Sequence, residues 1–237
     1  MSIEFGLLVV TSYLLGSVPM AYLVARYLRG IDLRQYGSGH SGASNVRRTI
    51  SMRVALPVVF YDFFKGVLIV VVAILLGMSA LQQVIIGIAV IIGHNWPVFL
   101  RFNGGRGLAA SMGVAFSLMP WGIAVFIVVG LLYFVVKSTP LPVLIAMAAL
   151  PVAGWVLGEP TAIIIGLLIL FLLMVTRRLT APKTATSATV SIRELLINRL
   201  LFDRDIKDSH AWMYRKPPED GAAQPSAKQP ETPEKGT

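Results

Sequence analysis

Seven apolar runs divide this chain up to residue 176, and they limit what it can fold into. A helix needs about 20 apolar residues to cross the hydrocarbon core of a bilayer, with a range of about 17–25. Because 55% of the residues are hydrophobic and 14% are charged, the chain is too apolar for an ordinary soluble domain. We predict an all-α integral membrane protein with about seven transmembrane helices, of which the fourth is short. The runs are 4–25, 54–77, 81–100, 107–119, 121–136, 140–157 and 161–176.

The distribution of lysine and arginine predicts the orientation of these helices. If the N-terminus lies outside, the inner segments hold 20 of the 21 Lys and Arg residues, and the exception is Lys65 in the second run. Because basic residues favour the cytoplasmic side, this pattern predicts an outer N-terminus and a cytoplasmic C-terminus. A multi-pass membrane protein whose two glycine-rich loops face the cytoplasm is therefore expected.

Two glycine-rich loops with arginines lie on the predicted cytoplasmic side. The first is GSGHSGASNVRR over 37–48, and the second is RFNGGRG over 101–107. Clustered glycines let backbone N–H groups converge into a nest for anions, and arginine binds phosphate oxygens strongly. The two loops predict a binding site for phosphorylated substrates at the membrane surface. Short polar side chains of the first loop are Ser38, Ser41, Ser44 and Asn45.

The sequence lacks the residues that several other kinds of site would require. The chain has no cysteine, so disulfides and thiolate chemistry are excluded. The sequence shows no residues at the spacing expected of a metal-ligand cluster, of paired catalytic carboxylates or of a Ser-His-Asp triad. We therefore expect neither a metal nor a cofactor. The net charge of +9 follows the membrane topology and no nucleic-acid-binding module is found, so nucleic acid is not an expected partner.

The C-terminal part differs in composition from the membrane domain, which we place at 1–179. Residues 180–190 read as a linker. Residues 191–202 show helical spacing of apolar residues after a Ser-x-x-Glu capping box, which predicts an amphipathic helix on the membrane surface. The segment 203–237 is expected to be a cytoplasmic tail, disordered from about residue 215 because of its Pro, Lys, Glu and Gln content.

Three motifs, in order, resemble those of the bacterial acyl-phosphate-dependent glycerol-3-phosphate acyltransferases (the PlsY family). The first runs from GSVP at 16–19 through the loop at 37–48, and the second is DFFKG over 62–66. The third, GHNWPVFLRFNGGRGLAASMG over 93–113, is close to the family's G-H-x-x-P-V-F-L-x-F-K-G-G-K-G pattern.

The resemblance implies transfer of a fatty acyl group from an acyl phosphate to the 1-hydroxyl of sn-glycerol 3-phosphate. The products are lysophosphatidic acid and phosphate. This reaction is the first step of phospholipid synthesis. Expected partners are thus glycerol 3-phosphate, acyl phosphate and membrane lipid. The resemblance also implies a location in the bacterial inner membrane, with the active site facing the cytoplasm. No histidine has an aspartate five residues after it, so the H-x-x-x-x-D signature of thioester-dependent acyltransferases is absent. That absence favours an acyl phosphate as donor.

The resemblance also assigns roles to residues of the two loops and of their flanking helices. Asp62 and Lys65 are interpreted as a structural ion pair, and His94 either as a structural cap or as a participant in catalysis. The expected catalytic residues are Ser38, His40 and His94. The expected substrate- and phosphate-binding residues are Arg34, Gly39, Gly42, Ser44, Asn45, Arg48, Lys65, Gly104, Gly105, Arg106 and Gly107.

The chain departs from the family pattern at several positions. His40 stands where the family usually has Asn, and Asn103 replaces a lysine of the second loop. Near the C-terminus, RELLINRLL over 193–201 lacks the family's His and Asn. His40 could compensate for that histidine by donating to a phosphate or accepting the hydroxyl proton. Alternatively, the chain is a divergent non-catalytic or transporter-like membrane protein that binds phosphorylated ligands or lipid.

Overall fold

All regular structure in the described part of the chain is helical. The computed structural model describes residues 3–136, 140–181, 190–208 and 211–212. Short 3-10 turns occupy Leu33–Gln35, Val98–Leu100 and Pro120–Gly122. The α-helices are α1 (Ile3–Ser17), α2 (Met20–Arg29), α3 (Ala43–Thr49), α4 (Met52–Leu75), α5 (Ala80–Asn95), α6 (Leu108–Leu118), α7 (Ile123–Val136), α8 (Pro140–Val156), α9 (Thr161–Leu179) and α10 (Ile192–Phe202).

In the part of the chain that the structure describes, four helical segments are long and apolar enough to cross a membrane. They are Ile3–Arg29, Met52–Leu75, Ala80–Leu100 and Thr161–Leu179. The first consists of α1 and α2, which are separated at Pro19, where the missing N–H interrupts helical hydrogen bonding. Each of the seven predicted runs contains a helix, but α6 has 11 residues and would be only about 16 Å long. The count of seven crossings therefore stays a prediction.

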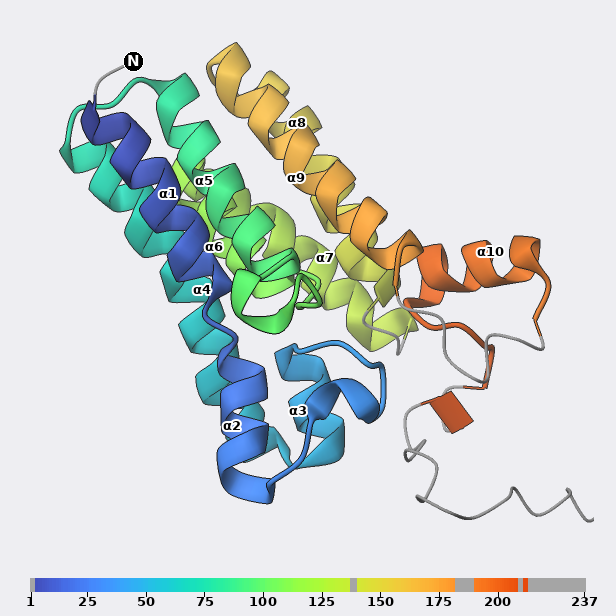
Figure 1. Cartoon of the computed structure of the whole chain (residues 1–237). Helices are drawn as coiled ribbons and strands as arrows, with labels where there is room; N and C mark the ends of the chain where they lie inside the picture. Colours follow the sequence, from blue (N-terminus) through green and yellow to red (C-terminus); the bar gives the residue numbers. More distant parts are fainter. Residues whose placement is uncertain (1–2, 137–139, 182–189, 209–210, 213–237) are drawn as a thin grey trace, which may run out of the picture.

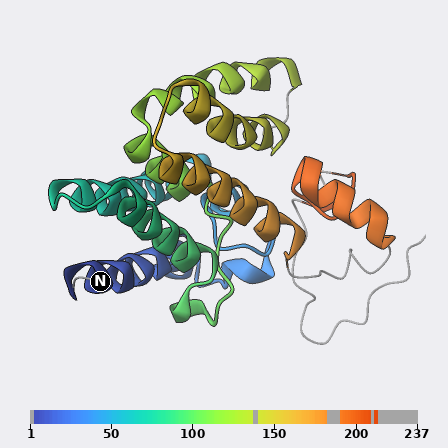
Figure 2. The same ribbon diagram turned by 90° about the horizontal axis from the view of Figure 1, so that it is seen from above.

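The membrane helices pack at close crossings that glycines permit. α1 contacts α5, α4 contacts α6, and α9 lies between α5 and α8 (Figures 1 and 2). A Cβ atom at Gly93 would collide with the carbonyl oxygen of Tyr13, and one at Gly113 with that of Phe63. Small residues at such points let two helix backbones meet, as is common in membrane proteins. These crossings bring together the ends of α1, α4, α5 and α6 that lie opposite the N-terminus.

The two glycine-rich loops and the C-terminal helix lie toward the end of the helices opposite the N-terminus (Figure 1). Helix α10 begins after Ser191, whose hydroxyl accepts a hydrogen bond from the N–H of Glu194 at 3.3 Å. Its buried side chains are Leu195, Asn198 and Arg199, while Ile192 is exposed. The buried face is thus partly polar, and contact of α10 with the membrane stays a prediction. Most of the expected linker and the tail from 213 onward lie outside the described residues.

Candidate active site

A cavity of about 370 Å³ opens where the two glycine-rich loops meet the ends of α4, α5 and α9. Its polar wall is strongly cationic. The four arginines in its lining are Arg47, Arg48, Arg106 and Arg178. The titratable residues that line it besides these are His40, Asp62, His94 and Asp203. Charges from segments far apart in sequence thus face one space.

Most of the remaining lining of the same cavity is apolar. Met52 is 54% exposed and Leu56 is 44% exposed, both at the outer surface of α4, so this part of the lining reaches the lipid-facing side of the bundle. One cavity therefore offers both positive charge and hydrocarbon contact. The large apolar side chains of this lining are Met52, Leu56, Val59, Leu108, Met112, Val143 and Met174.

Asn45 holds the first loop in its folded shape. Its side-chain oxygen accepts a hydrogen bond from the N–H of Ser38 at 3.2 Å. Its amide nitrogen donates to the carbonyl oxygens of Leu33, Tyr36 and His40 at 3.0, 2.9 and 3.1 Å. The side chain is fully buried and outside the cavity lining. The polar atoms of this amide are therefore used within the loop.

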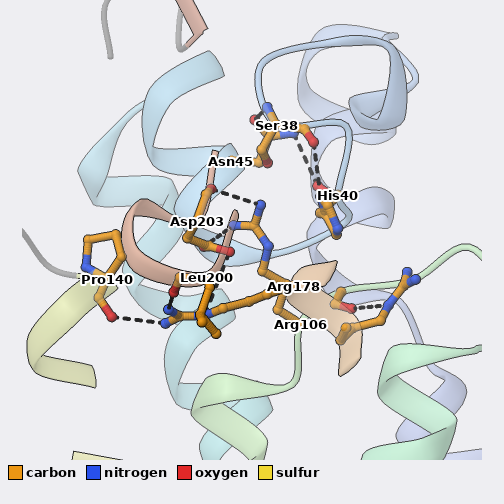
Figure 3. A network of polar contacts seen from close by, with 10 residues as sticks. Ser38, His40, Asn45, Arg106, Pro140, Arg178, Leu200 and Asp203 are labelled. Atoms are coloured by element: carbon orange, nitrogen blue, oxygen red, sulfur yellow. Dashed lines mark hydrogen bonds and ion pairs between the residues drawn. The ribbon is translucent and has the colours of Figure 1, made fainter. Parts of the chain in front are cut away.

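His40 turns one ring nitrogen into the loop and leaves the other without a partner. Its Nδ1 lies 2.9 Å from the carbonyl oxygen of Ser38 (Figure 3). Because a carbonyl only accepts hydrogen bonds, the neutral ring carries its hydrogen on Nδ1, and Nε2 holds a lone pair. Nε2 is buried with no hydrogen-bond partner among the described residues, in a side chain that lines the cavity. Such a nitrogen is suited to accept a proton.

The electrostatic surroundings keep His40 neutral. Burial, together with the positive charges of Arg106 and Arg177, holds the pKa of His40 well below its ordinary value of 6.5. The pKa of Arg48 is lowered as well, first by burial and then by Arg106. Both shifts reflect a site rich in positive charge.

We expect His40 to make the folded protein less stable as the pH falls, because its pKa is lower in the folded than in the unfolded state. Below about pH 6.5, His40 binds a proton in the unfolded chain but stays unprotonated in the folded protein. The free energy of unfolding therefore falls as the pH drops toward the lower pKa of the folded state. One pH unit corresponds to about 1.4 kcal/mol. Between pH 6.5 and 5.5 the wild type should therefore lose up to about that much more stability than His40→Asn. Thermal unfolding in detergent micelles measures this difference, and an equal acid loss in both proteins would contradict the expectation.

The second loop is held by an arginine that follows it by more than 70 residues. Arg177 at the end of α9 donates through Nε to the carbonyl oxygen of Gly105 at 3.0 Å and through Nη2 to that of Gly104 at 3.2 Å. The N–H of Gly105 donates to the carbonyl oxygen of His94 at 3.1 Å. A Cβ atom at Gly105 would collide with His94 Nε2, so the contact requires glycine.

A buried cluster of Asp62, Lys65 and His94 lies beneath the loops. Lys65 Nζ is 2.8 Å from Asp62 Oδ1 and 2.9 Å from His94 Nδ1, and it donates to the carbonyl oxygen of Gly16 at 3.2 Å. Because an ammonium only donates, His94 Nδ1 accepts from Lys65 and the ring hydrogen lies on Nε2. His94 Nδ1 also lies 3.4 Å from Asp62 Oδ1. The two histidines of the cavity therefore carry opposite tautomers, one fit to accept a proton and one to donate a hydrogen bond.

Arg34 lies outside the cavity and is held by its neighbour. Asp32 accepts hydrogen bonds from the Arg34 N–H at 3.0 Å, from Nε at 3.0 Å and from Nη2 at 2.6 Å. The hydrogen bonds from Arg34 hold the pKa of the Asp32 carboxyl below its ordinary range. This pair shapes the entry to the first loop. Arg34 also donates to the carbonyl oxygen of Leu100, directly before the second loop, at 3.4 Å.

The structure separates the predicted site residues into two groups. Those in the cavity lining are His40, Gly42, Ser44, Arg48, His94, Arg106 and Gly107. Those outside the lining are Arg34, Ser38, Gly39, Asn45, Lys65, Gly104 and Gly105. Sequence reasoning missed Arg177, Arg178 and Asp203. In the described residues, no group of three His, Cys, Asp or Glu side chains is placed to hold a metal ion.

Comparison with known proteins gives one consistent family. The model of a family described as glycerol-3-phosphate acyltransferase matches residues 6–184. Glycerol-3-phosphate acyltransferase 5 of Dehalococcoides mccartyi strain 195 is 42% identical over 221 residues, covering 91% of this chain and 95% of the relative. Glycerol-3-phosphate acyltransferase 4 of strain CBDB1 is 43% identical over 221 residues, with the same coverage.

Solved structures agree with the sequence relatives. The crystal structure of PlsY (YgiH), an integral membrane glycerol 3-phosphate acyltransferase, in its glycerol 3-phosphate form is 30% identical, with a TM-score of 0.70. The match covers 74% of this chain and 88% of that one. The lysophosphatidic acid form of the same protein gives 29% identity and a TM-score of 0.67, with the same coverage.

Proposed function

The chain belongs to the glycerol-3-phosphate acyltransferase family and is an acyltransferase, and on that premise we propose that its acyl donor is an acyl phosphate. The acceptor oxygen is the 1-hydroxyl of glycerol 3-phosphate. This oxygen attacks the acyl carbonyl carbon, the bond from that carbon to the phosphate oxygen breaks, and inorganic phosphate leaves. Lysophosphatidic acid is the other product, and the hydroxyl proton passes to a base in the site.

The cavity with both a cationic and an apolar lining is the observation that carries this proposal. The reaction brings together two phosphorylated molecules, of which the donor carries a hydrocarbon chain. Arg48 and Arg106 face the space that would hold the phosphates, and Met52 and Leu56 line the side that opens toward lipid. Holding both reactants in one orientation supplies a large part of the catalysis, because the donor is already an activated anhydride.

Two histidines are assigned complementary parts. His40 presents an unprotonated Nε2 to the cavity and is proposed to take the proton from the attacking hydroxyl. His94 carries its hydrogen on Nε2 because Lys65 donates to Nδ1. That N–H, next to the backbone of the second loop, is proposed to stabilise negative charge that develops on the acyl carbonyl oxygen.

The remaining predicted residues bind phosphate or shape the loops. The Ser38 hydroxyl is buried without a hydrogen-bond partner among the described residues, so it can donate to a phosphate oxygen after a small loop adjustment. Arg48 and Arg106 supply fixed charge. Asn45 and Arg34 are proposed as positioning residues, since their polar groups contact the loops themselves.

The membrane orientation is part of the same proposal. We infer seven crossings, an outer N-terminus and a cavity that faces the cytoplasm of a bacterial inner membrane. The placement of lysine and arginine supports this orientation. A cytoplasmic cavity would receive glycerol 3-phosphate directly from the metabolite pool.

A direct assay tests the donor. Purified protein in micelles is given radiolabelled glycerol 3-phosphate with palmitoyl phosphate, and a parallel tube receives palmitoyl-coenzyme A. Label in lysophosphatidic acid is expected with palmitoyl phosphate alone. Transfer from palmitoyl-coenzyme A alone would overturn the donor assignment. If protein shown to be folded transfers label from neither donor, the result would favour the alternative, a divergent membrane protein that binds phosphorylated ligands without catalysis.

A further inference from the structure

A carboxylate from the C-terminal segment occupies the cationic wall of the cavity. Asp203 forms an ion pair with Arg106, and its backbone carbonyl accepts a second hydrogen bond from Arg106 Nη2 at 3.3 Å (Figure 3). Its other carboxylate oxygen lies 3.8 Å from Arg178 Nε. The arginine of the second glycine-rich loop, assigned above to phosphate, is therefore already in contact with an anion.

Asp203 is the carboxylate in this lining that faces the arginines. Of the described residues that line the cavity, Asp62 and Asp203 carry carboxyl groups. Asp62 is paired with Lys65 at 2.8 Å in the buried cluster. Asp203 thus offsets part of the charge of Arg47, Arg48, Arg106 and Arg178.

The fold around α10 fixes the position of this carboxylate. Asp203 ends α10 in the left-handed region, with φ 57° and ψ 39°, a conformation that Asp and Asn adopt more easily than most residues. Arg178 donates to the carbonyl oxygen of Leu200 at 2.8 Å, one turn before Asp203. Arg199 pairs with Asp205 at 2.7 Å and donates to the carbonyl oxygen of Leu179 at 2.8 Å. The turn after α10 is therefore tied to the end of α9.

We propose that Asp203 sets the phosphate affinity of the site by competing with the phosphate group of a substrate for Arg106. The inference rests on the proposed function in that it takes Arg106 as a phosphate ligand. A phosphate dianion carries more charge than a carboxylate and offers more acceptor oxygens, so it displaces Asp203 from Arg106 when it binds. Asp203 pairs with the arginine again when phosphate leaves, which weakens retention of the phosphate product.

Asp203→Asn tests this competition at little structural cost. Asparagine has nearly the same shape and tolerates the left-handed conformation, but it lacks the charge. We expect the variant to have a KM for glycerol 3-phosphate or for palmitoyl phosphate lowered by on the order of tenfold, since a nearby countercharge is lost in a partly buried site. Varying each substrate at saturating levels of the other shows which phosphate uses Arg106. The inhibition constant of inorganic phosphate should fall by a similar factor.

Asp205→Asn is the matched control. It removes the same charge two residues away, from a carboxylate that pairs with Arg199 and is outside the cavity lining. If loosening of the C-terminal segment alone raised the affinity, this control would show the same fall in KM as Asp203→Asn, and the proposal would be overturned. Unchanged KM values and an unchanged inhibition constant of phosphate in Asp203→Asn would also overturn the proposal. Higher values would overturn it by showing that Asp203 orients Arg106 for binding.

A binding measurement separates this inference from the assignment of the donor. Thermal unfolding of the purified full chain is followed at rising concentrations of inorganic phosphate, without any acyl donor. Phosphate should stabilise Asp203→Asn at about tenfold lower concentration than wild type, because a ligand stabilises the folded state according to its affinity. If palmitoyl phosphate proves not to be a donor, this shift still decides the role of Asp203. Equal phosphate dependence in both proteins would refute the competition.

Discussion

Replacing Arg48 with alanine is expected to lower acyl transfer by about 10³-fold, to near the detection limit. Arg48 projects from α3 into the cavity lining, and its Nε is buried without a partner among the described residues. It can therefore meet a phosphate with a charge-assisted hydrogen bond that no water replaces equally well. The initial rate of labelled glycerol 3-phosphate incorporation into lysophosphatidic acid measures the effect. Inorganic phosphate should also lose most of its capacity to stabilise the variant.

Arg53→Ala provides the comparison for Arg48→Ala. Arg53 lies five residues further along, is exposed in the first turn of α4 and does not line the cavity. The two variants lose the same side chain near the same membrane surface, but Arg53→Ala should keep transfer within about twofold of wild type. Near-normal transfer by Arg48→Ala would remove this arginine from the phosphate site.

Replacing Lys65 with methionine is expected to destabilise the protein by about 3–5 kcal/mol, because it leaves the buried Asp62 carboxylate without its cation. The Lys65 side chain is 2% exposed and that of Asp62 is 6% exposed, so hydration by water can offset little of the loss. The carbonyl oxygen of Gly16 also loses its donor. Unfolding by denaturant in detergent micelles measures the loss, which should lower the midpoint and leave the slope unchanged.

The double variant Lys65→Met with Asp62→Leu separates stability from catalysis. Removing both charges should restore most of the lost stability, since a buried ion pair is often replaceable by apolar side chains. We expect transfer to stay low, because methionine cannot donate to His94 Nδ1 and the imidazole tautomer is no longer fixed. Recovery of both stability and transfer would restrict the pair to a structural role. Failure of the double variant to regain stability would show that apolar side chains cannot replace this pair.

Several contacts at the site could not be predicted from local sequence. Arg177 and Arg178 follow the last apolar run, where the positive-inside rule already accounts for basic residues, so nothing in their neighbourhood indicated a second role. In the structure Arg177 binds the carbonyl oxygens of the second loop, and Arg178 reaches Leu200 and Pro140. These partners lie between 22 and 73 residues away along the chain. Only the packing of α9 against α5 and α8 brings them together.

Asn45 shows the same limit within a single loop. Its place in a glycine-rich segment with arginines made it a candidate phosphate ligand. The structure instead uses both ends of its amide to join backbone groups of the same loop. A polar side chain in such a loop can bind either the ligand or the loop, and composition does not distinguish the two. Its direct contact with phosphate stays a prediction.

The sequence alone determined that this is a helical membrane protein, that two glycine–arginine loops carry its polar chemistry and that its motifs are those of an acyltransferase family. These properties are local, since hydropathy adds up along a helix and a motif is a run of adjacent residues. Tertiary structure alone decided that Lys65 donates to His94 and that Asp203 pairs with Arg106. Each of these depends on the relative position of groups on separate segments, which is fixed by helix packing and by burial of charge.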